Sequence, residues 1–428
     1  MILTTESLTV TLSRRYPISF APDNNPIVHV GTDTVDVVSH DADFLWKNVR
    51  GNIEGMPPEQ VAPLTCRAGD SIIVAKSGAP HVDRKPYHDA PCKAEIHRMG
   101  IVQFVSYPQW SAQTFRPCGI GGDRSFRPCG IGGDRAQTLR DYRVPLEQCN
   151  LDRLPSVVEL PPETVRVLLP YLEHLFGGFC GEVRDGWGTE TITPAFQHPG
   201  YGSYFSSSVS LGLVLLSSTI PQTAKRVLAE RMTQWGLDIA GAFYDRRVNT
   251  SNGGHMQGRK ALVILAGHLL GIDDMADPDT SNPHWQETIG YETLERPWWF
   301  GTWRHIWHPF GYGTGWFVTK PPREWTQDRV DGNGNTVRGQ RFYLSYMNQV
   351  LGGQVGTALA MRLMGLQREM GSAFIGAIAQ WMEGPPAAAV EELRALGMTW
   401  PWGTDYTVGP GAGICADAWR SVGGMVLP

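Results

Sequence analysis

The segment 249–271, NTSNGGHMQGRKALVILAGHLLG, places polar residues that suit anion or sugar binding directly in front of an apolar helix. Two glycines separate Asn252 from His255, and Gln257 and Arg259 follow at once. Glycine lets a backbone approach a ligand closely. A helix start offers unpaired N–H groups and the positive end of the helix dipole. The segment therefore predicts one wall of a binding site for an anion or a sugar, and the alternative is a polar cap on a buried helix.

These residue types suit the β-elimination of an acidic sugar. In that reaction a base removes the proton α to a carboxylate, and the enzyme must stabilise the carboxylate charge. His255 is the predicted base because histidine has an ordinary pKa of about 6.5. Asn252, Gln257 and Arg259 are the predicted hydrogen-bond donors toward the carboxylate. The acid would be a tyrosine, and the candidates are Tyr312, Tyr343 and Tyr346.

Glycoside hydrolysis is the alternative chemistry, and it requires two carboxylates roughly 5–9.5 Å apart. The glycine-rich segment 180–190 carries acids around Trp187, and Asp245 lies just before the segment that contains His255. Tryptophan stacks on sugar rings, so Trp187 is a predicted substrate contact. The acids of segment 180–190 are Glu182, Asp185 and Glu190.

The segment 295–316, ERPWWFGTWRHIWHPFGYGTGW, concentrates aromatic and basic side chains. Stacking on sugar rings explains such a segment about as well as packing between helices does. His305 and His308 have a spacing that suits two metal ligands, but no third ligand is evident, so we predict no metal and no cofactor. The predicted substrate-binding residues of the segment are Trp298, Trp299, Trp303, Arg304 and His305.

Charge and hydropathy narrow the class of protein. The formal net charge is −5 and no run of Lys or Arg occurs, which argues against a nucleic-acid surface. No window approaches the ~20 apolar residues of a membrane span, and segment 1–17 lacks the pattern of a secretory signal. We therefore expect no membrane association and a cytoplasmic or particle-associated protein. The seven cysteines include no CxxC pair and are expected to be mostly free thiols, while homo-oligomerisation stays open.

Two periodicities divide the chain of 428 residues. Short alternating or β-branched runs within 1–113 predict a β-sandwich-like module. Within 159–428, apolar residues recur at helical spacing and predict an all-α domain of paired helices. The strands are expected at Leu8–Leu12, Ile27–Val30, Val35–Ser39, Ser71–Ala75 and Ile101–Tyr107. The helices are expected at 161–176, Tyr204–Ser218, Ala224–Tyr244, Gln257–Leu270, Arg341–Leu366 and Met370–Met382.

A repeated segment lies in the predicted linker, 114–158. The sequence FRPCGIGGDR occurs at Phe115–Arg124 and again, unchanged, at Phe126–Arg135. Two copies are too few for a solenoid, which needs at least three. The GIGG core has neither the preceding strand nor the following helix of a phosphate-binding loop. The segment is therefore interpreted as a duplicated surface loop or linker, with ligand binding as the alternative.

Paired apolar helices, Trp-rich loops and an Asn…His motif before a helix resemble the (α/α)-toroid carbohydrate-active enzymes. These include alginate-lyase-like polysaccharide lyases and six-hairpin glycosidases, and the resemblance covers residues 160–385. In the toroid lyases an Asn neutralises the uronate carboxylate, while a His and a Tyr handle protons. The resemblance implies these roles for Asn252, His255 and one of the three tyrosines. It implies cleavage of an acidic polysaccharide, with glycoside hydrolysis as the alternative. A non-catalytic glycan-binding or structural protein of a phage or surface assembly is the second alternative.

Overall fold

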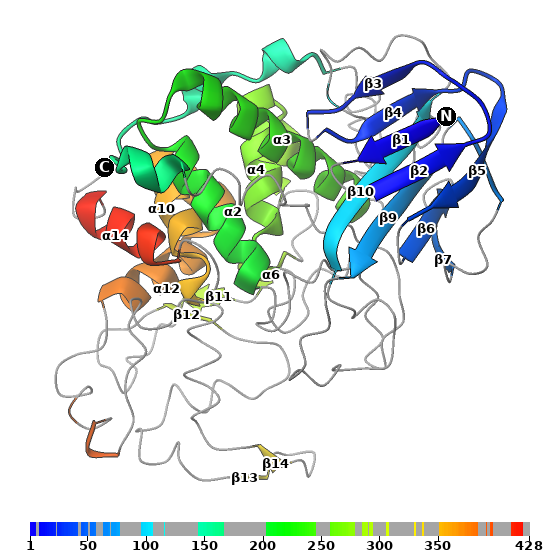
Figure 1. Cartoon of the computed structure of the whole chain (residues 1–428). Helices are drawn as coiled ribbons and strands as arrows, with labels where there is room; N and C mark the ends of the chain where they lie inside the picture. Colours follow the sequence, from blue (N-terminus) through cyan, green and yellow to red (C-terminus); the bar gives the residue numbers. More distant parts are fainter. Residues whose placement is uncertain are drawn as a thin grey trace.

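The structure is a computed structural model. It describes most of the N-terminal strands and several of the helices that follow them. The described residues are 1–5, 8–22, 24–41, 44–49, 52–56, 63–68, 70–77, 96–105, 115, 144–166, 203–244, 257–278, 285–289, 291–293, 305–307, 329–330, 336–337, 351–383, 391, 394–396 and 412–422. In Figure 1 the strands of the N-terminal part lie on one side of the molecule and the helices lie on the other. The chain is therefore a mixed β + α protein.

The N-terminal strands form two sheets. The order in the smaller sheet is β1-β2-β5-β8, and the order in the larger sheet is β3-β4-β10-β9-β6-β7. Neighbouring strands are antiparallel, except that β10 runs parallel to β4. The smaller sheet comprises β1 (Ile2–Thr5), β2 (Leu8–Leu12), β5 (Thr34–His40) and β8 (Leu64–Arg67). The larger comprises β3 (Ile18–Phe20), β4 (Pro26–His29), β6 (Phe44–Val49), β7 (Asn52–Met56), β9 (Ser71–Ser77) and β10 (Ile96–Val105).

One apolar cluster lies between the two sheets. Val35 and Val37 alternate with more exposed residues along β5 and are buried, because successive side chains of a strand point to opposite faces. They belong to the same cluster as Val102 and Phe104 of β10 in the other sheet. All five strands expected from the sequence are present, and the bounds of β2 are those expected.

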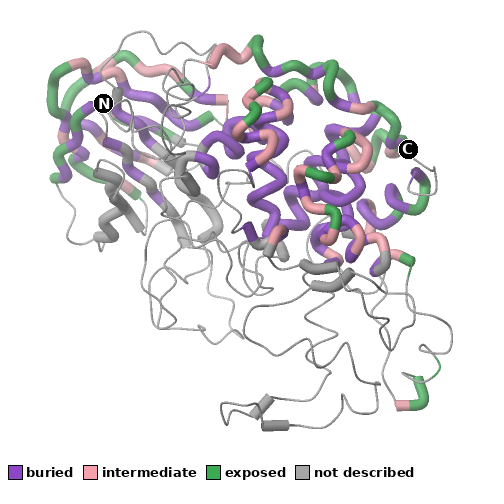
Figure 2. The backbone as a smooth tube through the Cα atoms, turned by 180° about the vertical axis from the view of Figure 1, so that it is seen from behind, coloured by how far each residue is buried: buried purple, intermediate pink, exposed green. Residues whose placement is uncertain are grey.

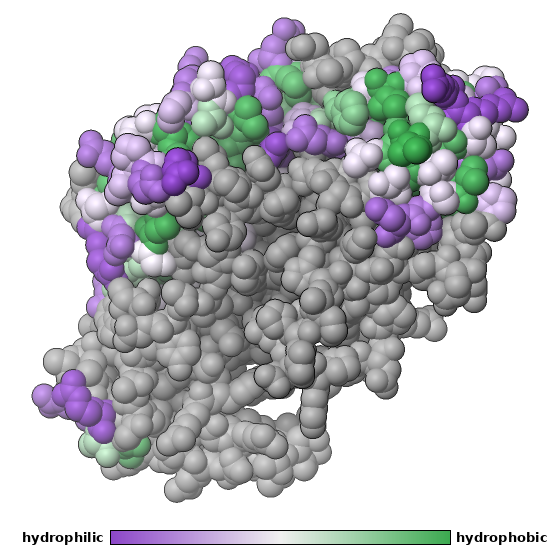
Figure 3. Space-filling model, in the orientation of Figure 1, coloured by the Kyte–Doolittle hydropathy of each residue, from purple (hydrophilic) through white to green (hydrophobic). Residues whose placement is uncertain are grey.

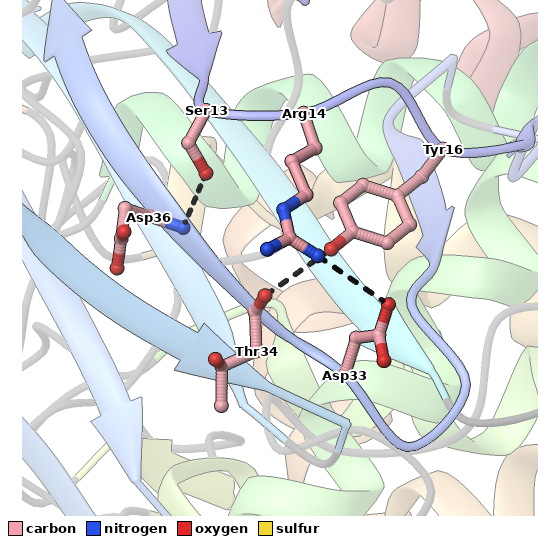
Figure 4. A network of polar contacts seen from close by, with 6 residues as sticks. All are labelled: Ser13, Arg14, Tyr16, Asp33, Thr34 and Asp36. Carbon is pink, nitrogen blue, oxygen red and sulfur yellow. Dashed lines mark hydrogen bonds and ion pairs between the residues drawn. The ribbon is translucent and has the colours of Figure 1, made fainter.

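The segment between β2 and β3 is tied to β5 by three exposed polar contacts. They join residues about twenty positions apart, so they fix a surface connection rather than a core. The exposed ion pair among them contributes at most about 1 kcal/mol. The contacts, drawn in Figure 4, are Asp36 N to Ser13 Oγ (3.1 Å), Tyr16 Oη to Thr34 O (3.1 Å) and Arg14 Nη1 to Asp33 Oδ2 (4.0 Å).

The helical part is built around α2 (Ser203–Leu216), whose residues 206–216 are all buried. A helix that is buried on every side lies inside a protein rather than on its surface, and Figure 2 shows this segment in purple. Its neighbours come from both earlier and later parts of the chain. They are α3 (Gln222–Tyr244), α4 (Arg259–Leu270), α10 (Val355–Leu363) and α14 (Ala412–Val422).

Glycines allow two of these helix contacts to be unusually close. A Cβ on Gly236 of α3 would collide with the Leu262 carbonyl oxygen and lie 2.7 Å from the Cβ of Ala266, both in α4. A Cβ on Gly356 of α10 would lie 2.6 Å from the Ser210 carbonyl oxygen of α2. Carbon atoms do not approach other nonbonded atoms so closely, so these helices pack backbone against backbone.

Helices α2, α3 and α4 lie where the sequence predicts them. The described part of the expected helix Arg341–Leu366 is α-helical at Val355–Leu363 (α10), and before it 351–352 form a π-helical turn and 353–354 a hydrogen-bonded turn. The pair Gly352–Gly353 lies at this irregularity, since glycine disfavours a regular helix interior. Helix α12 (Ser372–Glu383) corresponds to the expected helix Met370–Met382, whereas α11 (Gln367–Met370) and α14 were not expected from the sequence.

The expectation of an all-α C-terminal domain also needs correction. Two short antiparallel strand pairs interrupt it, because β-branched and aromatic residues at these positions favour strands. The helices α5 (Asp273–Ala276) and α6 (Gln286–Ile289) are only four residues long. The strands are β11 (Tyr291–Thr293), β12 (His305–Trp307), β13 (Arg329–Val330) and β14 (Thr336–Val337).

Two further expectations concern membranes and thiols. No helix within the described ranges has the length and apolar character needed to cross a bilayer. Figure 3 shows hydrophilic and hydrophobic side chains mixed over the described surface on this side of the molecule. The described cysteines, Cys66, Cys149 and Cys415, are all buried free thiols, as expected. Burial raises the pKa of Cys149 to about 11 and that of Cys415 to about 12, so neither is a reactive thiolate.

Candidate functional site at the start of helix α4

Helix α4 begins immediately after Gly258, which has a φ of 83°. Only glycine adopts this left-handed conformation without strain. Glycine has no side chain with which to cap the helix, and the cap comes from a distant residue instead. The Oε1 atom of Glu287, on α6, accepts a hydrogen bond from the Gly258 amide at 2.6 Å. The carboxyl group therefore lies at the positive end of the α4 dipole, where a negative charge is stabilised.

Gln257, the residue before Gly258, connects α4 to two other elements. Its Oε1 atom accepts a hydrogen bond from Gln354 Nε2 at 3.1 Å and a longer one from Ser206 Oγ at 3.5 Å. Gln354 is the residue before α10, and Ser206 lies in α2. The side chains of Gln257 and Gln354 are both fully buried. The start of α4 is thus joined by side-chain hydrogen bonds to α2, α6 and the start of α10.

Lys260 adds a second connection between α4 and α6. Its Nζ atom donates hydrogen bonds to Thr288 Oγ1 and to the carbonyl oxygen of Met370, each at 2.9 Å. The ammonium group is fully buried, and burying a charge is costly unless it is paired or hydrogen-bonded. These bonds supply that compensation and hold α4, α6 and α11 together.

The Glu287 carboxyl is 1% exposed and has an unusual electrostatic environment. Burial raises its pKa above the ordinary value, and the Gly258 amide and the charges of Lys260 and Arg259 offset only part of that effect. Within the described part of the chain, Oε2 of Glu287 and Nε2 of Gln257 are buried and make no hydrogen bond. We define the polar cluster as Gln257, Arg259, Lys260, Glu287, Thr288 and Gln354.

Two of the predicted site residues lie in the polar cluster. Gln257 is fully buried and Arg259 is 1% exposed, so protein atoms enclose both side chains instead of leaving them on a binding surface. Direct contact with a polymer would require the cluster to open, whereas a role in holding the start of α4 requires no change. The predicted roles of these two residues as donors to a substrate stay predictions.

The structure describes little of the other predicted site residues. For His305 it places only the backbone, in β12, which pairs with β11. The tandem FRPCGIGGDR copies lie outside the described residues, apart from Phe115, which is buried. Also outside the described residues are Asn252, His255, Tyr312, Tyr343, Tyr346, Trp187, Trp298, Trp299, Trp303 and Arg304. The acids proposed for hydrolysis, Glu182, Asp185, Glu190 and Asp245, lie outside them too.

Glu287 is the residue that sequence reasoning missed. The sequence analysis took Asp245 as the carboxylate nearest to the motif, but the Glu287 carboxyl contacts Gly258 within it. The two residues are 29 positions apart, and no spacing pattern in the segment WQETIG links them. Gly258 has no side chain with which to cap its own helix, so the amide groups there need another partner, such as a distant side chain or water.

The chain has no recognised relative and, in its described part, no group of side chains that suits a metal ion. No group of three or more His, Cys, Asp or Glu within the described ranges could hold a metal ion. No protein-family model, curated protein or solved structure matches the chain. The geometry of the polar cluster and the sequence of the segments next to it are therefore the basis for any functional proposal.

Proposed function

We propose that the chain is a carbohydrate-active enzyme, a lyase that cleaves an acidic polysaccharide by β-elimination. The observation that carries the proposal is the meeting of Gln257, Glu287 and Gln354 in one polar cluster. In the chain, each of these residues adjoins a segment that holds predicted site residues. The cluster supports the proposal because Gln257 and Gln354 directly follow two of these segments in the chain, and Glu287 lies shortly before the third.

The three segments supply complementary chemistry. Asn252 and His255 precede Gln257, the tryptophans of segment 295–316 follow α6 and β11, and Tyr343 and Tyr346 precede Gln354. A base, an acid and aromatic contacts for sugar rings are the groups that an eliminating enzyme needs. Because all three segments adjoin residues of the polar cluster in the chain, we infer that they contribute to one site.

In the proposed reaction His255 accepts the proton α to the uronate carboxylate. Asn252 donates a hydrogen bond to that carboxylate and stabilises its developing charge. The electron pair forms a carbon–carbon double bond as the bond to the glycosidic oxygen breaks, and a tyrosine protonates the leaving oxygen. Gln257 and Arg259 have buried side chains, so in this proposal they hold the start of α4, into which the segment with Asn252 and His255 leads.

The architecture is consistent with this class of enzyme. The two N-terminal sheets share one apolar core, which supports a β-sandwich-like module. The helices around α2 pack in pairs, such as α3 with α4 and α2 with α10, which supports a toroid-like domain. Both finer descriptions of the fold are part of the proposal.

Glycoside hydrolysis is the second candidate, and Glu287 favours it. A carboxyl whose pKa is raised by burial is the usual form of a general acid in glycosidases. Hydrolysis also needs a second carboxylate at a defined distance. The described part of the chain places none against Glu287, so β-elimination stays the first proposal.

The test is to incubate the purified full-length chain with uronic-acid polysaccharides and to follow the absorbance of the unsaturated uronate. Absorbance that appears in wild type and disappears in His255→Ala is the expected result, with or without chelator. Reducing ends without that absorbance would replace the lyase with a hydrolase. Glycan binding without any cleavage would leave a non-catalytic glycan-binding protein of a phage or surface assembly.

A further inference from the structure

Two neighbouring residues of α6 each bind the start of α4. Glu287 accepts the Gly258 amide at 2.6 Å, and Thr288 accepts a hydrogen bond from Lys260 Nζ at 2.9 Å. Helix α6 has only four residues, and isolated helices this short are unstable in water. These side-chain bonds therefore contribute directly to holding α6 in place against α4.

We propose that Glu287, Arg259 and Lys260 form an ionisation-dependent clamp, in which the charge of the Glu287 carboxyl sets how firmly α6 is held to α4. The clamp is independent of whether the chain cleaves a polysaccharide. The clamp also concerns the predicted site segments. The segment with Asn252 and His255 leads into α4, and the segment 295–316 follows α6 and β11. A change in the clamp would act on the attachment of both segments.

The surroundings of the Glu287 carboxyl make the strength of its contacts depend on whether it is ionised. A hydrogen bond to an ionised acceptor is roughly twice as strong as one to a neutral acceptor, so the bond from Gly258 favours the ionised carboxyl. Burial has the larger effect and raises the pKa of Glu287, so ionisation on balance weakens the hold of α6 on α4. From α4, the charges of Lys260 and Arg259 favour the ionised form. Between α11 and α12, Gly371 lies next to the Glu287 backbone carbonyl, since a Cβ there would lie 3.7 Å from that oxygen, and glycine brings no charge.

The direction of the pH effect follows from the raised pKa. The neutral Glu287 carboxyl is favoured more in the native protein than in the unfolded chain. The group therefore contributes its full stabilisation of the native protein at low pH, where it is neutral in both states. That contribution is lost as the pH rises through the pKa of the folded state. The charges of Lys260 and Arg259 lower the pKa of Glu287 by less than burial raises it, so the direction of the pH effect is set by burial.

The experiment compares full-length wild type with Glu287→Gln between pH 5 and pH 8, using the thermal unfolding midpoint Tm. Glutamine keeps an acceptor for the Gly258 amide but cannot ionise. The Tm of the variant relative to wild type is expected to increase with pH by several degrees. Glu163→Gln is the matched control, because Arg166 lowers the pKa of that exposed carboxyl and no change is expected above pH 5.

A second variant tests the coupling to Lys260. In the Lys260→Met background, loss of the positive charge should raise the pKa of Glu287 further. The Tm difference between Glu287 and Glu287→Gln should therefore keep increasing up to a higher pH than it does with Lys260 present. A Tm difference that stays constant from pH 5 to pH 8 would overturn the clamp. A difference that increases toward low pH would overturn it too, because Glu287 would then be a permanently ionised partner of Lys260 and Arg259. If Lys260→Met does not fold, the Glu287→Gln comparison decides alone.

Discussion

Ser210 of α2 and Thr357 of α10 join two helices through side-chain oxygens that lie 2.9 Å apart in the protein interior. Ser210 Oγ donates its proton to the carbonyl oxygen of Gly353 at 2.7 Å and accepts the Thr357 amide N–H at 3.1 Å. The Thr357 hydroxyl is therefore the donor to Ser210. A serine hydroxyl has one donor and two acceptor positions, and all three are used here.

Replacing Ser210 with alanine should destabilise the protein by about 1–3 kcal/mol, because the buried Thr357 amide and the Gly353 carbonyl lose their partner. Chemical denaturation followed by far-UV circular dichroism measures the change. Ser421→Ala is the control, since Ser421 Oγ bonds only the Ala418 carbonyl oxygen on the partly buried face of α14. If both variants lose the same free energy of unfolding, the contact between α2 and α10 contributes no more than an ordinary surface hydrogen bond.

Gly236→Ala should be among the most damaging single substitutions in the helical part. The added methyl group would collide with the Leu262 carbonyl oxygen, a backbone atom that cannot rotate away. Overpacking of this kind costs about 1–3 kcal/mol or more. Gly413→Ala on α14 is the counterpart, because a Cβ there meets nothing within 4 Å. Alanine is the better helix former by about 1 kcal/mol, so Gly413→Ala should leave the Tm unchanged or raise it.

His268 should make the stability depend on pH below neutrality. Its pKa is lowered by burial and, to a lesser degree, by the charge of Arg153, while its hydrogen bond to the Arg153 carbonyl oxygen partly opposes this. The native state therefore prefers the neutral ring. The stabilisation is complete above the ordinary pKa and is lost as the pH falls from about 6.5 through the lowered value.

The variant His268→Asn, which cannot take up a proton, should show a smaller fall in Tm between pH 7.5 and pH 5. Arg153 also donates a hydrogen bond to the His268 carbonyl oxygen, and this backbone contact stays in the variant. An identical pH dependence in wild type and variant would refute the assignment.

His255→Ala should abolish cleavage or glycan binding while leaving the Tm within a few degrees of wild type. The sequence places His255 in a loop, and loop side chains make few core contacts. Cleavage is measured by the unsaturated-uronate absorbance, and binding by calorimetry with a uronate oligosaccharide. A variant that unfolds, but whose folded fraction binds normally, would favour the polar-cap interpretation of this segment.

Local patterns predicted the elements whose own residues determine them. The alternation of β5 and the long apolar periods of α3 and α4 are visible in the sequence, and the structure has them there. The interior of the polar cluster could not be predicted in the same way. Gln257 and Arg259 have polar side chains, which usually lie at the surface. Their burial depends on partners such as Gln354, 97 positions away from Gln257.

The same limit explains the other errors. Glu287 caps α4 from a helix of four residues, too short to show a periodic pattern. The pair Gly352–Gly353 lies in the irregular turn that precedes α10, and the apolar spacing of the sequence does not reveal this turn. Contacts between distant segments are set by the whole fold, and a single sequence carries no direct record of them.

The burial of residues 206–216 of α2 has a consequence for synthesis on the ribosome. Helix α14 is the last described element of the chain, yet it packs against α2 and α10, and its Cys415 side chain lies beside Gly356. While the ribosome is still translating 412–422, the apolar surface that α14 will cover on α2 is exposed to water. Nascent chains with such surface are prone to aggregation. Stalled or truncated products that lack α14 should therefore bind chaperones, and a soluble fragment should retain residues through 422.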